Sequence, residues 1–217
     1  MRRIRESENV QYQWDVFCII KTNITLGKKT MLKLERITAD NLELAVSVQE
    51  TLFPSESGRV NFEESVNGTT DYEYYLLYDN DACAGVIGIY SVEEDPDSAW
   101  LGWFGILRQF RRKHLGSEAL KKFEQMAAAK HFRYARLYTD EEDNDTAIAF
   151  YKANGYTPEP YRNEEDELCL KYRMLIFSKT LCDEAVPLWN HRNIHLTSQI
   201  AKQEAGKRST HLNKFHF

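Results

Sequence analysis

The alternation of apolar and polar residues predicts a strand followed by two helices in the first part of the chain. Residues 31 to 37 alternate as a strand with one buried face does. Asp40 then supplies a helix N-cap with Glu43 as its capping-box partner, ahead of apolar residues at helical spacing. A second, more polar helix is predicted over residues 57 to 66, where Gly68 provides a left-handed stop.

The middle of the chain has the pattern of a hairpin followed by a crossover unit. Alternating residues at 72 to 78 and at 86 to 90 flank an Asp-Asn-Asp turn, which predicts two antiparallel strands. Residues 99 to 107 are apolar on both faces, as in a central strand that is covered on both sides. A helix over residues 115 to 127 and a strand over residues 132 to 139 follow, so the strands before and after this helix should be parallel with a right-handed connection.

The remaining pattern completes one domain. A helix is predicted from Asn144 to Gly155, and alternating apolar residues from 168 to 174 predict a last strand. Together these elements predict one α/β (α+β) domain over residues 31 to 185, with a mixed central sheet of about six to seven strands and helices on both faces. Residues 1 to 30 are interpreted as an N-terminal extension and residues 186 to 217 as a basic C-terminal tail.

Negative charge is concentrated in the predicted domain. The chain of 217 residues has a formal net charge of -5, yet residues 31 to 185 contain 17 Lys and Arg against 29 Asp and Glu. Both end segments have an excess of basic residues. An acidic domain favours a small cationic substrate over a nucleic acid. Aromatic residues are also not interleaved with the basic run as base-stacking platforms would be.

The sequence favours the cytoplasm as the compartment. Its longest apolar runs, at residues 16 to 20 and 100 to 107, are far shorter than the roughly 20 residues of a membrane-spanning helix. No clean apolar core with a small-residue cleavage site follows the first arginines, so no secretory signal is expected. The four cysteines are widely scattered without a C-x-x-C pair, which is typical of reduced thiols and predicts neither a disulfide nor a metal site.

A basic turn is the first candidate for chemistry. Residues 106 to 117 end a predicted strand and open a predicted helix, and they include Arg111, Arg112 and Lys113. Exposed backbone N–H groups and the positive end of the helix dipole make such a position an anion site, which basic side chains strengthen. The residues alone leave two interpretations open: a phosphate cradle, or a solvated basic loop that only caps the helix.

Two motifs in this half of the chain resemble those of the GNAT N-acetyltransferase superfamily. The run from Arg111 to Gly116 is similar to its pyrophosphate-binding motif, R/Q-x-x-G-x-G/A, and the run from Asn144 to Tyr151 is similar to its N-x-x-A-x-x-F-Y signature. The resemblance extends upstream through residues 100 to 107, and the order of strands and helices agrees. His114 stands where the first glycine is common and Arg108 where a proline is, and these two departures bear on cofactor affinity.

The resemblance implies an enzyme with acetyl-CoA as its cosubstrate. In that family a substrate amine attacks the thioester directly, without a covalent enzyme intermediate. The strand that ends near Leu107 would diverge from its parallel neighbour and pair through its backbone with the pantetheine arm. The residues that would contact the cofactor are Gly105, Ile106, Leu107, Arg111, Arg112, Lys113, His114, Leu115, Gly116, Ser117 and Asn144.

The resemblance also implies a general acid. Tyr151 matches the family's tyrosine that protonates the departing thiolate, and a phenol with a reference pKa of about 10 keeps its proton at neutral pH. By residue type alone Tyr151 also fits a core aromatic, and Asn144 fits a helix N-cap. Acidic residues ahead of the central strand could receive the amine proton through water, and Glu94 and Asp97 are the candidates for this general base.

The predicted reaction is therefore acetyl transfer from acetyl-CoA to a primary amine of a small cationic molecule or a peptide. The alternative is a catalytically weak or inactive CoA-binding module of the same fold. Neither a nucleic acid nor a membrane is expected as a partner. A homodimer is compatible with the resemblance, since many relatives pair through strands or C-terminal segments.

Overall fold

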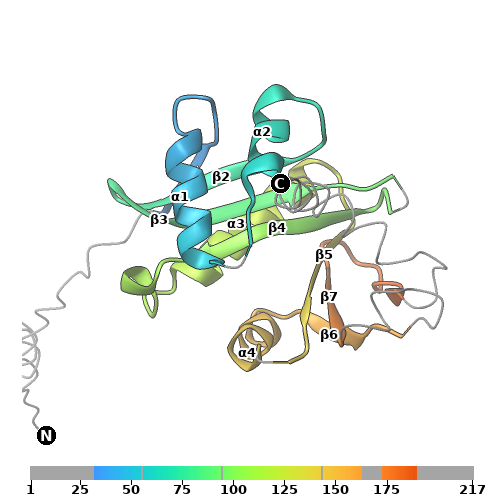
Figure 1. Cartoon of the computed structure of the whole chain (residues 1–217). Helices are drawn as coiled ribbons and strands as arrows, with labels where there is room; N and C mark the ends of the chain where they lie inside the picture. The colour runs from blue at the N-terminus through green and yellow to red at the C-terminus, as the bar shows by residue number, and fades with distance from the viewer. Residues whose placement is uncertain (1–31, 55, 94, 143, 163–172, 190–217) are drawn as a thin grey trace, which may run out of the picture. The chain divides into compact units, whose positions relative to one another are not determined.

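The computed structural model describes residues 32–54, 56–93, 95–142, 144–162 and 173–189, which form one mixed sheet with helices on both faces (Figure 1). The strands are β1 (Leu32–Arg36), β2 (Glu73–Asp79), β3 (Ala82–Tyr90), β4 (Ser98–Ile106), β5 (Tyr134–Asp140), β6 (Thr157–Pro160) and β7 (Met174–Thr180). The helices are α1 (Leu42–Leu52), α2 (Arg59–Asn67), α3 (Leu115–Ala129) and α4 (Asp145–Ala153), with a 3-10 turn at Arg108–Phe110. The described strands lie in the order β1-β2-β3-β4-β5-β7-β6, and this mixed sheet of seven strands confirms the predicted fold class.

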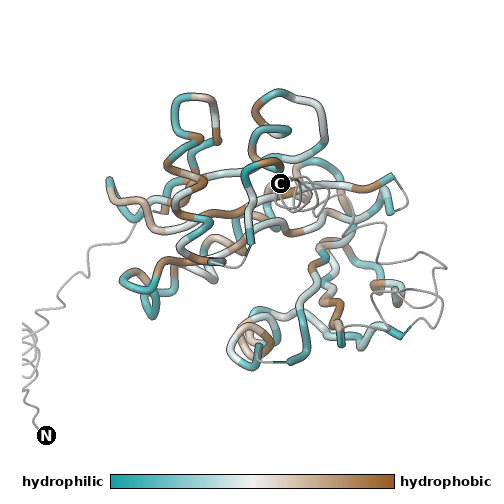
Figure 2. The backbone as a smooth tube through the Cα atoms, viewed as in Figure 1, coloured by the Kyte–Doolittle hydropathy of each residue, from teal (hydrophilic) through white to brown (hydrophobic). Residues whose placement is uncertain are grey.

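The sheet separates two hydrophobic clusters. On one face, here called the α1/α2 face, Val46 and Phe62 of the two helices pack over the strands. On the other, the α3/α4 face, Phe123 is enclosed and Phe150 packs against its neighbours. Figure 1 shows α1 in front of the sheet and α3 behind it. Hydrophobic positions recur along the strands and helices and hydrophilic positions dominate many connecting turns (Figure 2), as expected when each helix buries one stripe.

Of the predicted ends of the first two helices, one is confirmed and one is wrong. Gly68 is the left-handed C-cap of α2, with a φ of 65°, so this predicted stop is confirmed. The predicted capping box is wrong, because α1 has Asn41 rather than Asp40 at its N-cap. The Asn41 side chain makes no capping bond and accepts a hydrogen bond from the Thr38 backbone N–H at 2.8 Å instead. A local turn therefore sets the start of this helix.

The sequence pattern does not predict β6. Its residues Pro158 and Pro160 cannot donate to a ladder and argue against a central strand, but β6 is the edge of the sheet, where proline is tolerated. The last predicted strand, residues 168 to 174, lies mostly outside the described residues. Strand β7 begins at its final position, Met174.

Strands β4 and β5 are paired only where they begin. Residues 98–100 of β4 pair in parallel with residues 134–136 of β5, which confirms the predicted parallel arrangement. Beyond these positions β4 continues to Ile106 along β3, and β5 continues to Asp140 along β7. The two strands therefore separate (Figure 1), and the second half of β4 has a backbone edge that no described strand covers, here called the open edge.

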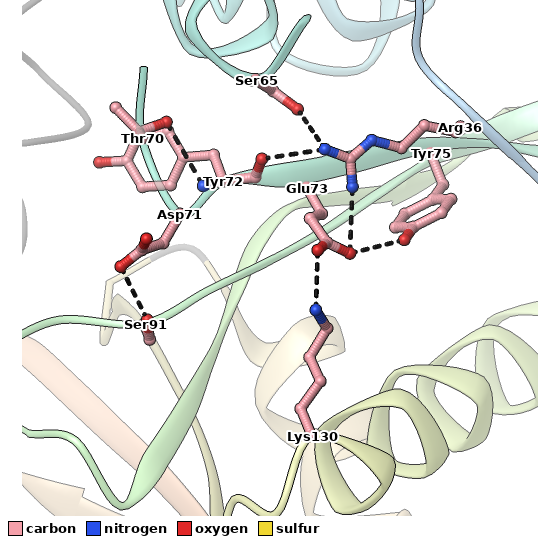
Figure 3. Close-up of polar contacts among 9 residues, drawn as sticks. All are labelled: Arg36, Ser65, Thr70, Asp71, Tyr72, Glu73, Tyr75, Ser91 and Lys130. Carbon is pink, nitrogen blue, oxygen red and sulfur yellow. Dashed lines mark hydrogen bonds and ion pairs between the residues drawn. The ribbon is translucent and has the colours of Figure 1, made fainter. Parts of the chain in front are cut away.

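A polar cluster fixes the far end of α3 to the sheet. The Glu73 carboxylate in β2 accepts hydrogen bonds from Lys130 Nζ and the Tyr75 hydroxyl, each at 2.7 Å, and pairs with Arg36 at 3.0 Å (Figure 3). Burial alone would raise the pKa of Glu73, but these hydrogen bonds and cations lower it below its usual value. The cluster holds the C-terminal end of α3, and the N-terminal end of that helix lies beside the open edge.

The side chain of Tyr74 lies across two neighbouring strands on the α1/α2 face. It is fully buried, and glycines in β3 and β4 leave room for it. A Cβ at Gly88 would be 2.2 Å from Tyr74 Cε1, and a Cβ at Gly102 would be 2.9 Å from the Tyr74 hydroxyl oxygen. Both glycines are therefore required by the close approach of one aromatic side chain.

We expect Gly88→Ala to lower the free energy of unfolding by about 1–3 kcal/mol, because the methyl group must displace the Tyr74 ring. Gly102→Ala should lower it less, since the added group meets the hydroxyl end of the same side chain. Denaturant unfolding in the wild type and in Tyr74→Phe tests both. Tyr74→Phe removes the hydroxyl but keeps the ring carbons Cε1 and Cζ, which would lie 3.0 and 3.2 Å from a Cβ at Gly102. It should therefore relieve part of the effect of Gly102→Ala and leave the effect of Gly88→Ala; an equal effect of Gly102→Ala in both backgrounds would contradict this packing.

Trp189 packs on the sheet beyond the predicted boundary at residue 185. Trp189 is fully buried on the α1/α2 face, with its ring centroid 5.1 Å from that of Trp100. Its backbone N–H donates to Glu159 Oε2 at 2.8 Å, and Arg136 Nη2 donates to the Pro187 carbonyl at 2.8 Å. Trp189 of the segment interpreted as a tail thus contributes to the core, and the residues after it lie outside the described part of the chain.

Candidate active site

The turn between β4 and α3 presents a run of backbone N–H groups without acceptors. Helix α3 begins after His114, and no side chain caps it. Within the described residues, none of the backbone N–H groups from Arg112 to Ser117 donates a hydrogen bond. Arg112 and His114 both have a φ of 62°, and such left-handed residues turn neighbouring N–H groups into an anion-binding concavity. Together with the helix dipole, this backbone suits a diphosphate.

The basic side chains of the turn differ in what they contact. Arg111 Nε donates to the Ile106 carbonyl at 2.8 Å, which turns this side chain back onto the end of β4. Lys113 Nζ lies 3.4 Å from Asp79 Oδ2. The Arg112 side chain is exposed and has no ion pair within the described part of the chain. Of Arg111, Arg112 and Lys113, the side chain most available to an anion is therefore Arg112.

His114→Gly should tighten acetyl-CoA binding by about two- to tenfold, up to about 1.4 kcal/mol. Glycine adopts the left-handed backbone of this position without a steric penalty, and removing the imidazole clears the approach to the N–H groups. His131→Gly is the matched control, because His131 also has a positive φ, 67°, but lies beyond the opposite end of α3. Calorimetric titration measures both variants. Weaker binding by His114→Gly would mean that the imidazole itself contacts phosphate.

The last residues of β4 lie directly before this turn. Gly105 and Ile106 pair with β3, and the Leu107 N–H donates to the Ala84 carbonyl at 2.8 Å. On their other side no described strand is paired with them. Residues 105 to 107 therefore have one backbone edge that no described strand covers, and on this edge the Ile106 carbonyl already accepts the hydrogen bond from Arg111.

Helix α4 brings Phe150 to the turn, with Tyr151 beside it. The Phe150 ring centroid is 6.1 Å from that of Phe104 in β4, and a Cβ at Gly116 would be 3.3 Å from Phe150 Cε2. Tyr151 packs against Phe150 and Phe177, with centroid distances of 5.3 and 5.4 Å. Tyr151 is thus next to Phe150 in sequence and in space, and the Phe150 ring contacts both β4 and the start of α3.

Burial raises the pKa of Tyr151 well above its usual value, because the phenolate would lose solvation among the surrounding rings. The hydroxyl is therefore protonated throughout the neutral and mildly alkaline range. Tyr151 can supply a proton, and it cannot act as a base at neutral pH. This is the protonation state that a general acid requires.

The family follows from comparison with known proteins. Residues 34–156, more than half of the chain, match the model of the acetyltransferase (GNAT) family. The chain belongs to the GNAT family. This GNAT protein is an acetyl-CoA-dependent N-acetyltransferase, which confirms the predicted enzyme class and cosubstrate.

Solved GNAT structures share the fold of this enzyme at low sequence identity. A GNAT-family acetyltransferase from Desulfovibrio desulfuricans is 15% identical with a TM-score of 0.59, over 70% of this chain and 100% of that one. A Bacillus subtilis acetyltransferase in complex with CoA is 16% identical with a TM-score of 0.52, over 71% and 100%. A spermidine N-acetyltransferase chimera from Vibrio cholerae is 16% identical with a TM-score of 0.55, over 69% and 95%. No curated protein matched the chain.

The other predicted residues of this GNAT enzyme are not all brought together. Asn144 is at the N-cap of α4, but its side chain makes no capping bond. Asp97 lies before the start of β4, about 30 Å along that strand from the basic turn. Glu94 lies outside the described residues. Asp95, in the same acidic segment, is fully buried and lies 3.4 Å from Arg136 Nε, so this acid belongs to the core.

Trp103 is a further residue at the open edge, and no motif marks it. The pairing between β3 and β4 shifts here, so β4 has one extra residue between Gly102 and Gly105. Such a bulge interrupts the alternation of side chains. Trp103 therefore packs on the α1/α2 face, the same face as Trp100. Regular alternation would have put it on the opposite face, so the sequence pattern could not place it.

Two further expectations concern the surroundings of the enzyme. Among the described helices, none has the length and apolar character needed to cross a bilayer. Cys83 is partly buried and Cys182 is exposed, and neither forms a disulfide with another described residue. Cys18 and Cys169 lie outside the described residues.

Proposed function

We propose that this GNAT enzyme transfers the acetyl group of acetyl-CoA to a primary amine of a small cationic molecule or a peptide by direct attack. The observation that carries the proposal is the run of acceptor-free backbone N–H groups from Arg112 to Ser117, next to the open edge of β4. The turn suits a diphosphate, and the edge suits an extended chain with amide groups such as pantetheine.

The proposed reaction moves one acetyl group and one proton. The lone pair of the amine attacks the thioester carbonyl carbon, the carbon–sulfur bond breaks, and the thiolate takes a proton from the Tyr151 hydroxyl. The amine loses its own proton to solvent, and Tyr151 is protonated again from solvent. Burial keeps the Tyr151 hydroxyl protonated, so the proton is present when the thiolate leaves. The same burial makes the phenol a weaker acid, so the role is carried by the position of Tyr151 in the N-x-x-A-x-x-F-Y motif. No described residue is assigned as the general base.

The charge of the enzyme supports a cationic acceptor. Residues 31 to 185 hold 29 acidic against 17 basic residues, and an acidic surface raises the local concentration of cations. The Vibrio cholerae neighbour is a spermidine N-acetyltransferase, so a structure with this fold accepts a polyamine. Both observations favour small di- and polyamines over neutral acceptors.

The rate should rise with pH and stay high in the alkaline range. The attacking nitrogen must be neutral, so kcat/KM should increase up to the pKa of an alkylamine, about 10. Because burial raises the pKa of Tyr151, the phenol keeps its proton over this range and its loss should not lower the rate below about pH 10. Initial rates with the monoamine n-butylamine from pH 6 to 10 test this, because it has no second ammonium group whose loss could lower the rate. A descending limb between pH 8 and 9.5 would argue against Tyr151 as the acid.

An amine panel tests the proposed function. Release of free CoA from acetyl-CoA is followed with 1,4-diaminobutane, spermidine, n-butylamine and a short peptide with a free amino terminus. We expect turnover above background hydrolysis, highest for the polyamines. If no amine is acetylated, calorimetric titration of acetyl-CoA distinguishes two explanations. Binding of acetyl-CoA without transfer to any amine would support the weak or inactive CoA-binding module. Absence of binding would overturn both the acetyltransferase and the CoA-binding module.

A further inference from the structure

The turn between β4 and α3 has one part that backbone hydrogen bonds fix and one part that they do not. In the first part, residues 107 to 111, the Phe110 N–H donates to the Leu107 carbonyl at 2.9 Å. In the second part, residues 112 to 114, no backbone N–H donates to another described residue. The residues that lead directly into α3 must therefore be held by other contacts.

Two of these three residues have a backbone conformation that side chains disfavour. Arg112 and His114 both have a φ of 62°, where the Cβ of a residue other than glycine crowds its own backbone. Such conformations persist only where the surrounding structure holds them. Lys113 lies between the two, so a contact that fixes its side chain also restricts both neighbours.

The Lys113 side chain is fixed by the end of β2. Its Nζ lies 3.4 Å from Asp79 Oδ2 and 5.2 Å from the ring centroid of Phe110. The Asp79 side chain is only 7% exposed, and its other oxygen, Oδ1, accepts a hydrogen bond from Asn80 Nδ2 at 3.0 Å. Within the described residues, no other side-chain hydrogen bond, ion pair or ring contact joins residues 112 to 114 to the rest of the enzyme.

We propose that Asp79 is a positioning residue for acetyl-CoA, because its ion pair with Lys113 keeps the flanking residues in their left-handed conformations. The inference rests on the proposed function, in which this turn binds the diphosphate. Apparent affinity falls with the fraction of molecules in the binding conformation, so support for the turn tightens binding. A carboxylate that acted only through its charge would repel the diphosphate. Positioning and charge therefore predict opposite effects of removing Asp79.

Asp79→Ala tests this difference in sign. We expect the Kd of acetyl-CoA, measured by calorimetric titration, to rise about three- to fivefold, while kcat at saturating acetyl-CoA stays nearly constant. S-Acetylpantetheine has the thioester and the pantetheine arm but no diphosphate, so kcat/KM for this donor should not change. Asp81→Ala is the matched control, because it removes the same charge from an exposed side chain of the same hairpin turn and should change the Kd by less than about 1.5-fold.

The His114→Gly background separates positioning from any effect of charge. Glycine adopts the left-handed conformation without a steric penalty, so the turn then needs less support. Asp79→Ala should therefore weaken acetyl-CoA binding less in His114→Gly than in the wild type. Lys113→Met breaks the same ion pair from its exposed side and should show the same dependence on the background. The inference can be judged from this variant if Asp79→Ala does not fold.

Several outcomes would overturn the inference and leave the proposed function intact. Tighter or unchanged acetyl-CoA binding by Asp79→Ala is one, and an equal loss in both backgrounds is another, because charge would then account for the effect. A parallel loss with S-acetylpantetheine is a third, since the effect would not depend on the diphosphate. Absence of acetyl-CoA binding in the wild type would instead overturn the proposed function and the inference with it.

Discussion

Tyr151→Phe should lower kcat about 100-fold and change the dissociation constant of acetyl-CoA by less than about twofold. The substitution removes one hydroxyl from a partly buried ring and leaves its packing against Phe150 and Phe177 in place. Loss of a positioned general acid typically lowers a rate by 10² to 10⁴. The thiolate of CoA is a comparatively good leaving group, so the lower end of this range is expected. Steady-state rates at saturating amine, with calorimetric titration of acetyl-CoA, measure the two effects.

Tyr156→Phe is the matched control for this experiment. Its ring centroid is 6.1 Å from that of Tyr151, it packs in the same cluster, and burial likewise raises the pKa of Tyr156 above its usual value. It lies outside the N-x-x-A-x-x-F-Y motif, so its loss should change kcat by less than about twofold. An unchanged kcat in Tyr151→Phe would make Tyr151 a core aromatic, the interpretation that its residue type alone allows. Equal losses in both variants would point to packing rather than proton transfer.

The fold was predictable where local patterns and burial agree. The apolar run that forms β4 is covered on both faces, and the strand, helix and strand from β4 through α3 to β5 form the predicted parallel unit. Predictions failed where a residue's role depends on its position in the whole sheet. Pro158 and Pro160 are compatible with β6 only because that strand is an edge, which its own residues do not reveal.

The candidate site likewise has parts that the sequence predicts and parts that it does not. The basic turn before α3 is a local feature, and its residue types together with the helix start were enough to predict an anion site there. Trp103 depends on a bulge, which arises from the pairing of β4 with β3 and leaves no signature in the alternation. Nothing near Asp95 in the sequence marks it as a buried acid, because its partner, Arg136, is far away in sequence. Long-range pairing of this kind is outside what a single sequence specifies.

Arg136 has the largest expected effect on stability. Its side chain is fully buried within β5, where few arginines are found without several partners. Nε lies 3.4 Å from Asp95 Oδ2 and donates to Ser98 Oγ at 3.1 Å. Nη1 donates to Ser178 Oγ at 2.6 Å and Nη2 to the Pro187 carbonyl at 2.8 Å. One guanidinium therefore connects β4, β5, β7 and the segment that carries Trp189 into the core.

Arg136→Met should lower the free energy of unfolding by about 3–5 kcal/mol, because it leaves the Asp95 carboxylate buried without its counter-ion. Arg133→Met is the matched control, since that side chain is partly exposed, pairs with Glu184 and should contribute no more than about 1 kcal/mol. Denaturant unfolding of both variants gives the difference. Adding Asp95→Asn to Arg136→Met should recover part of the loss, because the uncompensated charge is removed while the Trp100 indole N–H keeps an acceptor. Equal losses in the two single variants, or no recovery in the double variant, would mean that packing rather than buried charge determines the contribution of Arg136.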